Sequence, residues 1–463
     1  MADITADICV IGAGSGGLSV AAGAAQIGAR VVLIEGHKMG GDCLNYGCVP
    51  SKTLLAAGKA ARARGGAGPG DHAAAMERVA EVIASIAPVD SQERFEGFGV
   101  QVIRDWGRFS SPSTVVAGGN TITARRFVIA TGSAPLVPPI PGIHSLPFLT
   151  NESLFDLRTA PAHLVIIGGG PIGMEMAQAH LRLGCRVTVI EGASAMSRDD
   201  PEAAGVLVDA LRAEGLTLLE NARAESIAPG GEGVVVRTSQ GEVTGSHLLV
   251  AVGRKVNLDR LDLGAAKVAH DDKGVTVGPN LRSTTNRRVY AVGDAAGGLM
   301  FTHVASYHAG IVVRQAMFGL PARASIRAIP RATYTDPELA QVGLTEAEAR
   351  AAHGARLTVV REDMAHNDRA IAEGRTAGFL KLMVVGGRPV GATIVAAGAG
   401  DLIAIWALVI SARMKLSAVA GTVLPYPTMG EINKRAAGAY FAPWLFESAI
   451  VKRVVRAIQR WLP

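Results

Sequence analysis

Residues 7–17 read Asp-Ile-Cys-Val-Ile-Gly-Ala-Gly-Ser-Gly-Gly. The apolar run predicts a buried strand, and the glycines behind it predict a tight turn into a helix. Gly12, Gly14 and Gly17 stand at the three key positions of a dinucleotide-binding βαβ unit, in which helix N-terminal amides hold a pyrophosphate. A second predicted strand ends at Glu35, whose carboxylate would accept hydrogen bonds from a ribose.

The same pattern occurs a second time. A predicted strand over residues 164–167 precedes Gly168, Gly170 and Gly173, and the strand after the next helix ends at Glu191. The first glycine and the acidic residue are 23 positions apart in both copies. A single motif of this kind is weak evidence, since tight turns without a ligand share it. Two complete copies with matched acidic ends predict two dinucleotide sites.

Two cysteines follow the first copy. Cys43 and Cys48 lie in residues 40–52, Gly-Gly-Asp-Cys-Leu-Asn-Tyr-Gly-Cys-Val-Pro-Ser-Lys. A continuous helix would hold them too far apart for a disulfide, so we expect irregular backbone at Cys43 and a bend at Gly47. A helix that begins near Pro50 would place Cys48 at its N-terminus, where the helix dipole favours a thiolate. We therefore predict a redox-active pair.

A structural disulfide and a zinc site are the alternatives to a redox pair. The chain has four cysteines, which are few for a scaffold held together by disulfides. A zinc site would need two more soft ligands nearby and none is visible, so we predict no metal site. Cys9 and Cys185 fall at predicted strands and are expected in the core.

The composition indicates a globular protein with about three domains, since the chain has 463 residues and is 49% hydrophobic. No apolar run reaches the 18 residues of a membrane span. The acidic N-terminus lacks the basic-then-apolar order of a signal peptide, which favours a cytoplasmic protein. The net charge of +6 is spread along the chain, which argues against a nucleic-acid partner.

Two dinucleotide sites and one redox pair indicate an electron path. The first site precedes the cysteines closely, so we assign FAD to it and a nicotinamide to the second. Glu191 would repel a 2′-phosphate, which favours NAD. Arg198 is a nearby cation that keeps NADP as the alternative.

With these motifs the chain resembles the class I pyridine nucleotide–disulfide oxidoreductases, which include lipoamide dehydrogenase, glutathione reductase and mercuric reductase. The resemblance covers nearly the whole chain. It differs from the family at Asp42, where a Thr is more usual, and at Lys255-Val256-Asn257, where a Pro is expected. Further cofactor motifs match at Thr131 and Gly132 beside FAD, at Asp294 for the ribityl chain, and at Gly253 for the nicotinamide.

The resemblance implies a role for each residue of the redox segment. Cys48 would face the flavin and form a charge-transfer thiolate, and Cys43 would be the exposed cysteine that exchanges with the substrate. Lys52 would lie near flavin N5, paired with Glu175, and would stabilise negative charge on the reduced flavin. The alternative for Lys52 and Glu175 is two solvated helix charges.

The family layout implies an α/β fold with two Rossmann-like dinucleotide-binding domains and a C-terminal α+β dimerisation domain. That last domain would form a homodimer in which the partner completes each active site. The expected boundaries are 1–150 and 276–330 for the two FAD segments, 151–275 for the NAD(P) domain and 331–463 for the interface domain.

The C-terminal motif departs from the family. Residues 424–431 read Leu-Pro-Tyr-Pro-Thr-Met-Gly-Glu, so Tyr426 stands in the place of the acid–base His, while Glu431 matches the Glu that orients it. A Tyr side chain, with a pKa near 10, is a poor base at neutral pH but a possible acid. This disfavours thiol oxidation, and with it a standard dihydrolipoamide dehydrogenase. We assign no catalytic role to the other histidines considered: His303, His308 and His366.

The sequence thus predicts an FAD-dependent oxidoreductase that passes electrons from NAD(P)H to Cys43–Cys48 and on to a small-molecule or protein disulfide. The alternatives are reduction of a metal ion or a quinone, dihydrolipoamide dehydrogenase activity despite the missing His, and a redox-sensing flavoprotein. Mercuric reductases carry a C-terminal cysteine pair, whereas no cysteine follows Cys185 here.

Residues 450–462 form a basic amphipathic pattern. Such a helix can bind a membrane surface. We expect instead that its apolar stripe packs on the protein or its dimer partner.

Overall fold

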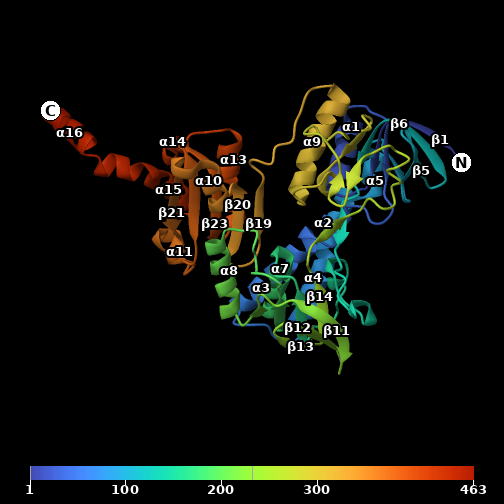
Figure 1. Ribbon diagram of the computed structural model, residues 1–463, viewed down its shortest axis with the longest axis horizontal. Helices are drawn as coiled ribbons and strands as arrows, with labels where there is room; N and C mark the ends of the chain where they lie inside the picture. Colours follow the sequence, from blue (N-terminus) through green and yellow to red (C-terminus); the bar gives the residue numbers. More distant parts are fainter. Residues whose placement is uncertain (1, 232, 463) are drawn as a thin grey trace. The chain divides into compact units, whose positions relative to one another are not determined.

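The computed structural model describes residues 2–231 and 233–462. The chain divides into two compact units, and both mix helices with strands (Figure 1). Unit 1 comprises Met1–Ala193 and Leu216–Ser325, and unit 2 comprises Ser194–Gly215 and Ile326–Pro463.

The first sheet of unit 1 has the order β3-β2-β1-β6-β5-β4, and β18 also pairs with β6. Strand order reverses at β1, which has β2 on one side and β6 on the other, so a ligand site is expected at the carboxyl end of β1. The parallel strands are β1 (Asp3–Ile11), β2 (Val31–Ile34), β3 (Gln101–Ile103), β6 (Asn120–Ile129) and β18 (Val289–Ala291), and the antiparallel ones are β4 (Arg108–Ser111) and β5 (Thr114–Ala117).

The second sheet of unit 1 repeats this design in the order β10-β9-β8-β14. All its strands are parallel, and β8 is buried along its whole length, which accounts for the apolar run of residues 164–167. Its strands are β8 (His163–Ile167), β9 (Arg186–Ile190), β10 (Thr217–Leu219) and β14 (His247–Val250). Small antiparallel sheets join β11 (Ala224–Gly230), β12 (Gly233–Thr238) and β13 (Gly241–Gly245), and β7 (Ser133–Pro135) with β15 (Arg254–Val256).

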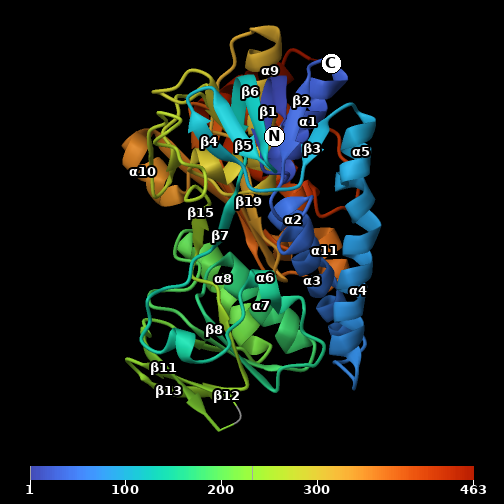
Figure 2. The same cartoon turned by 90° about the vertical axis from the view of Figure 1, so that its right-hand side faces the viewer.

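Helices α1 and α7 begin directly after the two glycine-rich turns, and α9 and α3 pack against these two helices, respectively. Figure 2 shows α4 running alongside α3. Both helices precede the strands of the second sheet in the sequence. The main helices are α1 (Ser15–Gln26), α2 (Gly41–Asn45), α3 (Cys48–Ala63), α4 (Asp71–Ile86), α7 (Pro171–Arg182) and α9 (Thr302–Phe318).

Unit 2 is built on a five-stranded antiparallel sheet of order β19-β20-β23-β22-β21. Trp406 is fully buried in its core, and its indole N–H donates to Asn433 Oδ1 at 2.6 Å. The strands are β19 (Pro330–Thr333), β20 (Glu338–Gly343), β21 (Leu357–Asp363), β22 (Phe379–Val385) and β23 (Arg388–Ala396), and the main helices are α8 (Pro201–Ala213), α10 (Glu346–His353), α13 (Ala404–Ser411), α15 (Glu431–Ala442) and α16 (Ala449–Gln459).

A buried lysine attaches α8 to this sheet. The Lys381 ammonium lies 3.1 Å from Asp200, 2.8 Å from Glu202 and 2.9 Å from Glu346, and its side chain is 6% exposed. Asp200 also caps α8 by accepting from the Glu202 amide. These ion pairs explain why residues 194–215 belong to unit 2, although the sequence places them between strands of the second dinucleotide unit.

Lys381→Met should destabilise unit 2 by about 3–5 kcal/mol, because it leaves the buried Asp200 carboxylate without its cation. Urea unfolding followed by the fluorescence of the buried Trp406 measures the loss. Lys255→Met removes an exposed i,i+4 pair with Asp259 and is the control, with a much smaller expected effect because solvent screens the pair. Equal effects of the two substitutions would contradict this account.

No helix within residues 2–231 and 233–462 combines the length and apolar character needed to cross a bilayer.

Candidate redox site

The first glycine loop is so tight that side chains cannot replace its hydrogens. Gly12 has φ of +106°, a conformation that glycine alone adopts easily. A Cβ on Gly17 would lie 1.8 Å from the Gly12 carbonyl oxygen, inside any contact distance. Gly14 is the extended N-cap of α1, so the amides at the start of that helix face the loop.

The second loop repeats this geometry. Gly168 has φ of +114°, and a Cβ on Gly173 would lie 1.9 Å from the Gly168 carbonyl oxygen. Gly170 is the N-cap of α7 with the same extended backbone as its counterpart. Both loops therefore have the shape that brings a pyrophosphate against helix N-terminal amides.

An acidic residue ends the second strand beside each loop. Glu35 Oε2 accepts from the Ala13 amide at 2.6 Å, and Glu191 Oε2 accepts from the Gly169 amide at 2.7 Å. Both carboxylates thus reach the residue after the first glycine of their loop. The structure brings the eight predicted dinucleotide residues into two equivalent cradles, and these residues fit a bound dinucleotide.

The redox segment contains the short helix α2 and the start of the 16-residue helix α3, with a break between them. Cys43 lies inside α2, so the expectation of irregular backbone at Cys43 is wrong. The bend is confined to Tyr46 and Gly47, where a Cβ on Gly47 would lie 2.8 Å from Asp42 Oδ2. Cys48 is the first residue of α3, as the position of Pro50 predicted.

Both cysteines are free thiols, and they hydrogen-bond to each other. The pKa of Cys48 falls to about 6, chiefly because of the hydrogen bond from Cys43, with help from Thr302 and the charge of Lys52 against burial and Asp42. The pKa of Cys43 is raised, chiefly because it donates to Cys48, and further by burial. Cys48 is therefore the thiolate of the reduced pair.

The hydroxyl of Thr302 completes this arrangement, with its Oγ1 3.2 Å from Cys48 Sγ. Thr302 begins α9 and was not singled out by sequence, because nothing in its local pattern points to a residue 254 positions earlier.

As whole residues, Cys48 is exposed and Cys43 is half-buried in this chain. The implied roles require a cofactor to cover Cys48 and leave Cys43 to the acceptor, and they stay predictions.

The low pKa of Cys48 predicts how the reduced protein reacts with iodoacetamide. Since the pKa lies below the ordinary thiol value of 9.0, the reactive thiolate is present above about pH 6 and is lost as the pH falls through that value. Labelling of Cys48, followed by mass spectrometry, should therefore rise through about pH 6. Cys43→Ala should move this midpoint upward and slow labelling at pH 7 by about tenfold, because alanine has no donor and removes the leading cause of the shift. Cys9→Ser, in the core, should leave the profile unchanged. An unchanged profile in Cys43→Ala would contradict this account.

Lys52 and Glu175 form the expected pair. Lys52 Nζ lies 2.7 Å from Glu175 Oε2, and the two side chains are 37% and 6% exposed. Burial of Glu175 rules out two solvated helix charges. Lys52 is one turn after Cys48 on the same face of α3, which explains how its charge stabilises that thiolate.

The redox segment packs directly on the first glycine loop. The Gly40 amide donates to the Ala13 carbonyl at 2.9 Å, and a Cβ on Gly41 would lie 2.6 Å from Gly14 Cα. Only backbone separates the cysteine helices from the predicted pyrophosphate site. This contact supports the assignment of FAD to the first loop rather than the second.

A charged cluster surrounds Asp294. Its carboxylate accepts from the Ser133 hydroxyl, and the same hydroxyl accepts from Arg254 Nε at 2.7 Å. Burial raises the pKa of Asp294, while Ser133 and Arg254 act in the opposite direction. Arg254 Nη2 also lies 3.1 Å from Asp42 Oδ1, so the carboxylate at the unusual position 42 has a cation partner.

The remaining cofactor-motif residues lie beside this cluster in sequence. Among the residues the structure describes, the Thr131 hydroxyl is buried without a hydrogen-bond partner, which fits a group that a cofactor would satisfy. Gly132 and Gly253 have φ of +64° and +144°. The Asn257 amide donates to Gly132 O at 3.0 Å, so the loop that lacks the expected Pro still reaches this site.

Comparison with known proteins decides the family. Residues 6–309 match the family "Pyridine nucleotide-disulphide oxidoreductase", and residues 329–437 match its dimerisation domain. The chain belongs to this family. The expected family and α/β fold class are confirmed, and FAD and NAD(P)H are the cofactors that pyridine nucleotide–disulfide oxidoreductases use. The dimerisation domain points to a homodimer.

Among similar proteins is the mercuric reductase of Streptomyces lividans, 34% identical over 94% of this chain and 96% of its own. The HOCl-induced flavoprotein disulfide reductase RclA of Escherichia coli has a TM-score of 0.85 at 29% identity, covering 93% of this chain and 99% of that one. A Cu(II) complex of RclA gives a TM-score of 0.84 at 29% identity over 92% and 98%. The chain is therefore a flavin-dependent oxidoreductase of the disulfide and metal-ion reductase type.

The family's C-terminal acid–base motif is altered in unit 2. Tyr426 is 68% exposed, and its hydroxyl donates to Asp368 Oδ2 at 2.7 Å, which raises the pKa of Tyr426. Within the described residues, Glu431 Oε2 is buried without a hydrogen-bond partner. Asp368 therefore holds Tyr426 in place of Glu431, and the phenol is a weaker acid than an ordinary tyrosine.

The structure describes contacts of the other three histidines considered with residues outside the redox pair. His308 is buried, its Nδ1 accepts from the Gly293 amide at 3.2 Å, and burial lowers its pKa. His303 stacks on Phe301, and His366 is exposed.

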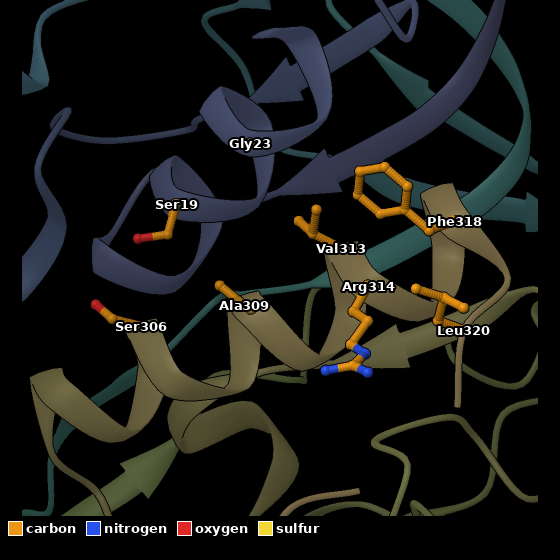
Figure 3. Close-up of a pocket in the computed structure, with 9 residues that line it drawn as sticks. Ser19, Gly23, Ser306, Ala309, Val313, Arg314, Phe318 and Leu320 are labelled. Atoms are coloured by element: carbon orange, nitrogen blue, oxygen red, sulfur yellow. The ribbon is translucent and has the colours of Figure 1, made fainter. Parts of the chain in front are cut away.

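A groove of about 540 Å³ lies between α1 and α9 (Figure 3). Its lining contains none of the redox or glycine-loop residues, so it is separate from the candidate site. Ser19 and Gly23 line it from α1, and Ser306, Ala309, Val313, Arg314 and Phe318 line it from α9.

Proposed function

We propose that this protein is an NAD(P)H-dependent reductase in which the pair Cys43–Cys48 passes electrons to a disulfide acceptor. The observation that carries the proposal is the low pKa of Cys48, hydrogen-bonded to Cys43 at the start of α3 and one turn from Lys52. A structural cysteine in the core has the opposite property, as the raised pKa of buried Cys185 illustrates.

When bound, FAD and the nicotinamide supply hydride transfer. The loop of Gly12, Gly14 and Gly17 would hold FAD, and the loop of Gly168, Gly170 and Gly173 would hold the nicotinamide. Glu191, beside the second loop, would repel a 2′-phosphate, and we propose NAD over NADP on this ground. Thr131, Gly132 and Asp294 would contact FAD, and Gly253 would border the nicotinamide.

The protein's own groups account for the sulfur chemistry. Cys48 carries the negative charge, and Lys52, held by Glu175, stabilises it. Cys43 would attack the acceptor disulfide while its proton passes through the Cys48 thiolate to the leaving sulfur, which releases one thiol and forms a mixed disulfide. The Cys48 thiolate would then attack Cys43 Sγ, releasing the second half of the acceptor as a thiolate that takes a proton from water and leaving the Cys43–Cys48 disulfide. The acceptor gains two electrons, and the pair loses two.

Reduction of a soft metal ion is the second candidate. Relatives such as the mercuric reductase of Streptomyces lividans favour it, and a Cu(II) complex is known for the structural relative RclA. Metal reduction needs little acid–base help, which suits a site with Tyr426 in place of His. A thiolate at Cys48 would serve as a soft ligand as well as a reductant.

Tyr426→His tests the choice between acceptors. We expect the native protein to oxidise dihydrolipoamide poorly and the variant to do so about a hundredfold faster, because a group of pKa near 6.5 can accept the thiol proton. Steady-state turnover with dihydrolipoamide, glutathione disulfide and mercuric ion measures this. Mercuric reduction should change less than about twofold. Tyr426→Phe, which keeps the ring and removes the hydroxyl, is the control. Rapid dihydrolipoamide oxidation by both native protein and Tyr426→Phe would contradict the argument.

A further inference from the structure

The C-terminal segment presents an apolar face that its own chain leaves uncovered. Helix α16 follows the single π-helical turn η6 (Pro443–Glu447), and none of its side chains is buried. Figure 1 shows α16 in red beyond α15 and away from the five-stranded sheet. The stripe therefore does not pack on its own subunit, whereas the expected packing on a dimer partner stays a prediction. The exposed apolar side chains are Trp444, Leu445, Phe446, Ile450, Val454, Val455, Ile458, Trp461 and Leu462.

The apolar and basic residues of α16 occupy opposite faces. At 100° per residue, Ile450, Val454 and Ile458 fall within one side of the helix, and Trp461 follows its C-terminal end. The other side carries only cations among its charged residues, and the chain has no acidic residue after Glu447. Three of the cations, Lys452, Arg453 and Arg456, are in the helix, and a fourth, Arg460, is its C-cap.

Charge decides which partner suits this face. A second copy of residues 449–462 would bring another four cations and no carboxylate to pair with them, so self-association would be opposed by repulsion. The family's dimerisation domain matches only to residue 437, before this segment begins. An anionic bilayer offers both an apolar layer for the tryptophans and phosphate charges for the cations.

We propose that residues 444–462 bind the surface of an anionic phospholipid bilayer, with α16 lying in the plane of the headgroups. Its 11 residues are too few to span the bilayer, which restricts the segment to one interface. The proposal is independent of the acceptor and does not depend on the redox site.

Co-sedimentation of the full-length holoenzyme with vesicles tests it. Vesicles with about one third phosphatidylglycerol should bind the protein at least about tenfold more tightly than vesicles of pure phosphatidylcholine, and salt should weaken the binding. The emission of Trp461, now 88% exposed, should shift to the blue on binding, and Trp461→Phe should remove most of that shift. Trp106→Phe, outside the segment, should preserve it.

Two matched charge reversals distinguish the effect of this segment's charge on vesicle binding from the effect of the protein's overall charge. Arg456→Glu should weaken binding to anionic vesicles about tenfold or more, whereas Arg356→Glu, at an exposed site on the dimerisation-domain match, should change it less than about twofold. Unaltered circular dichroism would show that both variants fold. The proposal is overturned by absent vesicle binding, by equal binding to both lipid compositions, or by equal effects of the two reversals. It is also overturned if Val454→Asp converts a larger oligomer into a smaller one in sedimentation, since a second copy would then cover the face.

Discussion

Replacing Cys48 with serine should lower NADH-dependent reduction of any disulfide or mercuric acceptor by at least about a thousandfold, the scale of losing a covalent nucleophile. The reason is that Cys48 carries the thiolate of the pair, and a serine hydroxyl neither ionises near neutral pH nor forms a disulfide with Cys43. Steady-state turnover measures the loss. Binding of FAD, measured as flavin absorbance per polypeptide, should persist because the glycine loops are untouched.

Cys43→Ser should stop acceptor reduction to a similar extent for a different reason. It keeps a thiol at Cys48 but removes the sulfur that would attack the acceptor. Alkylation distinguishes the two variants: Cys43→Ser retains a label at Cys48, and Cys48→Ser does not.

Cys185→Ser is the matched control, because Cys185 is buried beside β9 and its raised pKa keeps it as a thiol. It should leave turnover within about twofold. Native-level turnover in Cys48→Ser would exclude the pair from the reaction and favour a direct route from cofactor to acceptor. Equal losses in Cys48→Ser and Cys185→Ser would point to a folding defect.

Local sequence was sufficient for the dinucleotide units. An apolar run, a glycine turn and an acidic strand end follow one another within 30 residues, so the local sequence contains all the features that specify each unit. Gly17 and Gly173 illustrate this, since the constraint on each is a carbonyl only five residues earlier. The positions of β1, α1 and β2 could be predicted for that reason.

Contacts between distant segments could not be predicted in the same way. Thr302 reaches Cys48 across 254 residues, and Asp368 reaches Tyr426 across 58. Neither residue belongs to a motif, because its role depends on which surface the fold brings beside it. The pair of Lys52 with Glu175 is also distant, and it was expected only because the family resemblance implies it.

The same limit applies to Asp42 and to α8. Asp42 replaces a usual Thr, and its ion pair with Arg254 depends on a loop more than 200 residues away. Helix α8 follows β9 in sequence, yet buried Lys381 ties it to unit 2. In both cases a charged side chain finds its partner through tertiary packing, which periodicity does not encode.

Gly17→Val and Gly173→Val should separate the two cofactors. In each variant the new side chain would lie within 2 Å of a carbonyl oxygen of its own loop, so the loop must open and lose its pyrophosphate contacts. Gly17→Val should purify with less than about a tenth of the native FAD content. Gly173→Val should retain FAD and lose at least about a hundredfold in nicotinamide affinity.

Flavin absorbance per polypeptide and calorimetric titration with NADH and NADPH measure these effects without relying on turnover. The titration of the native protein also tests the preference for NAD that Glu191 predicts. Gly205→Ala is the control, because a Cβ there, within α8, meets no atom within 4 Å. It should retain both cofactors and, as an alanine replacing a helical glycine, the native melting temperature or a slightly higher one.

The two loops have nearly the same shape, and the packing of Gly40 and Gly41 on the first one distinguishes the FAD site from the nicotinamide site. If Gly173→Val lost FAD and Gly17→Val kept it, the assignment of cofactors would be reversed. The flavin would then belong to the loop beside Glu191, and the backbone contact between the cysteine segment and the first loop would have to serve another purpose. If Gly17→Val still folds and loses FAD while Gly173→Val keeps it, the flavin that supplies Cys48 with electrons belongs at that contact.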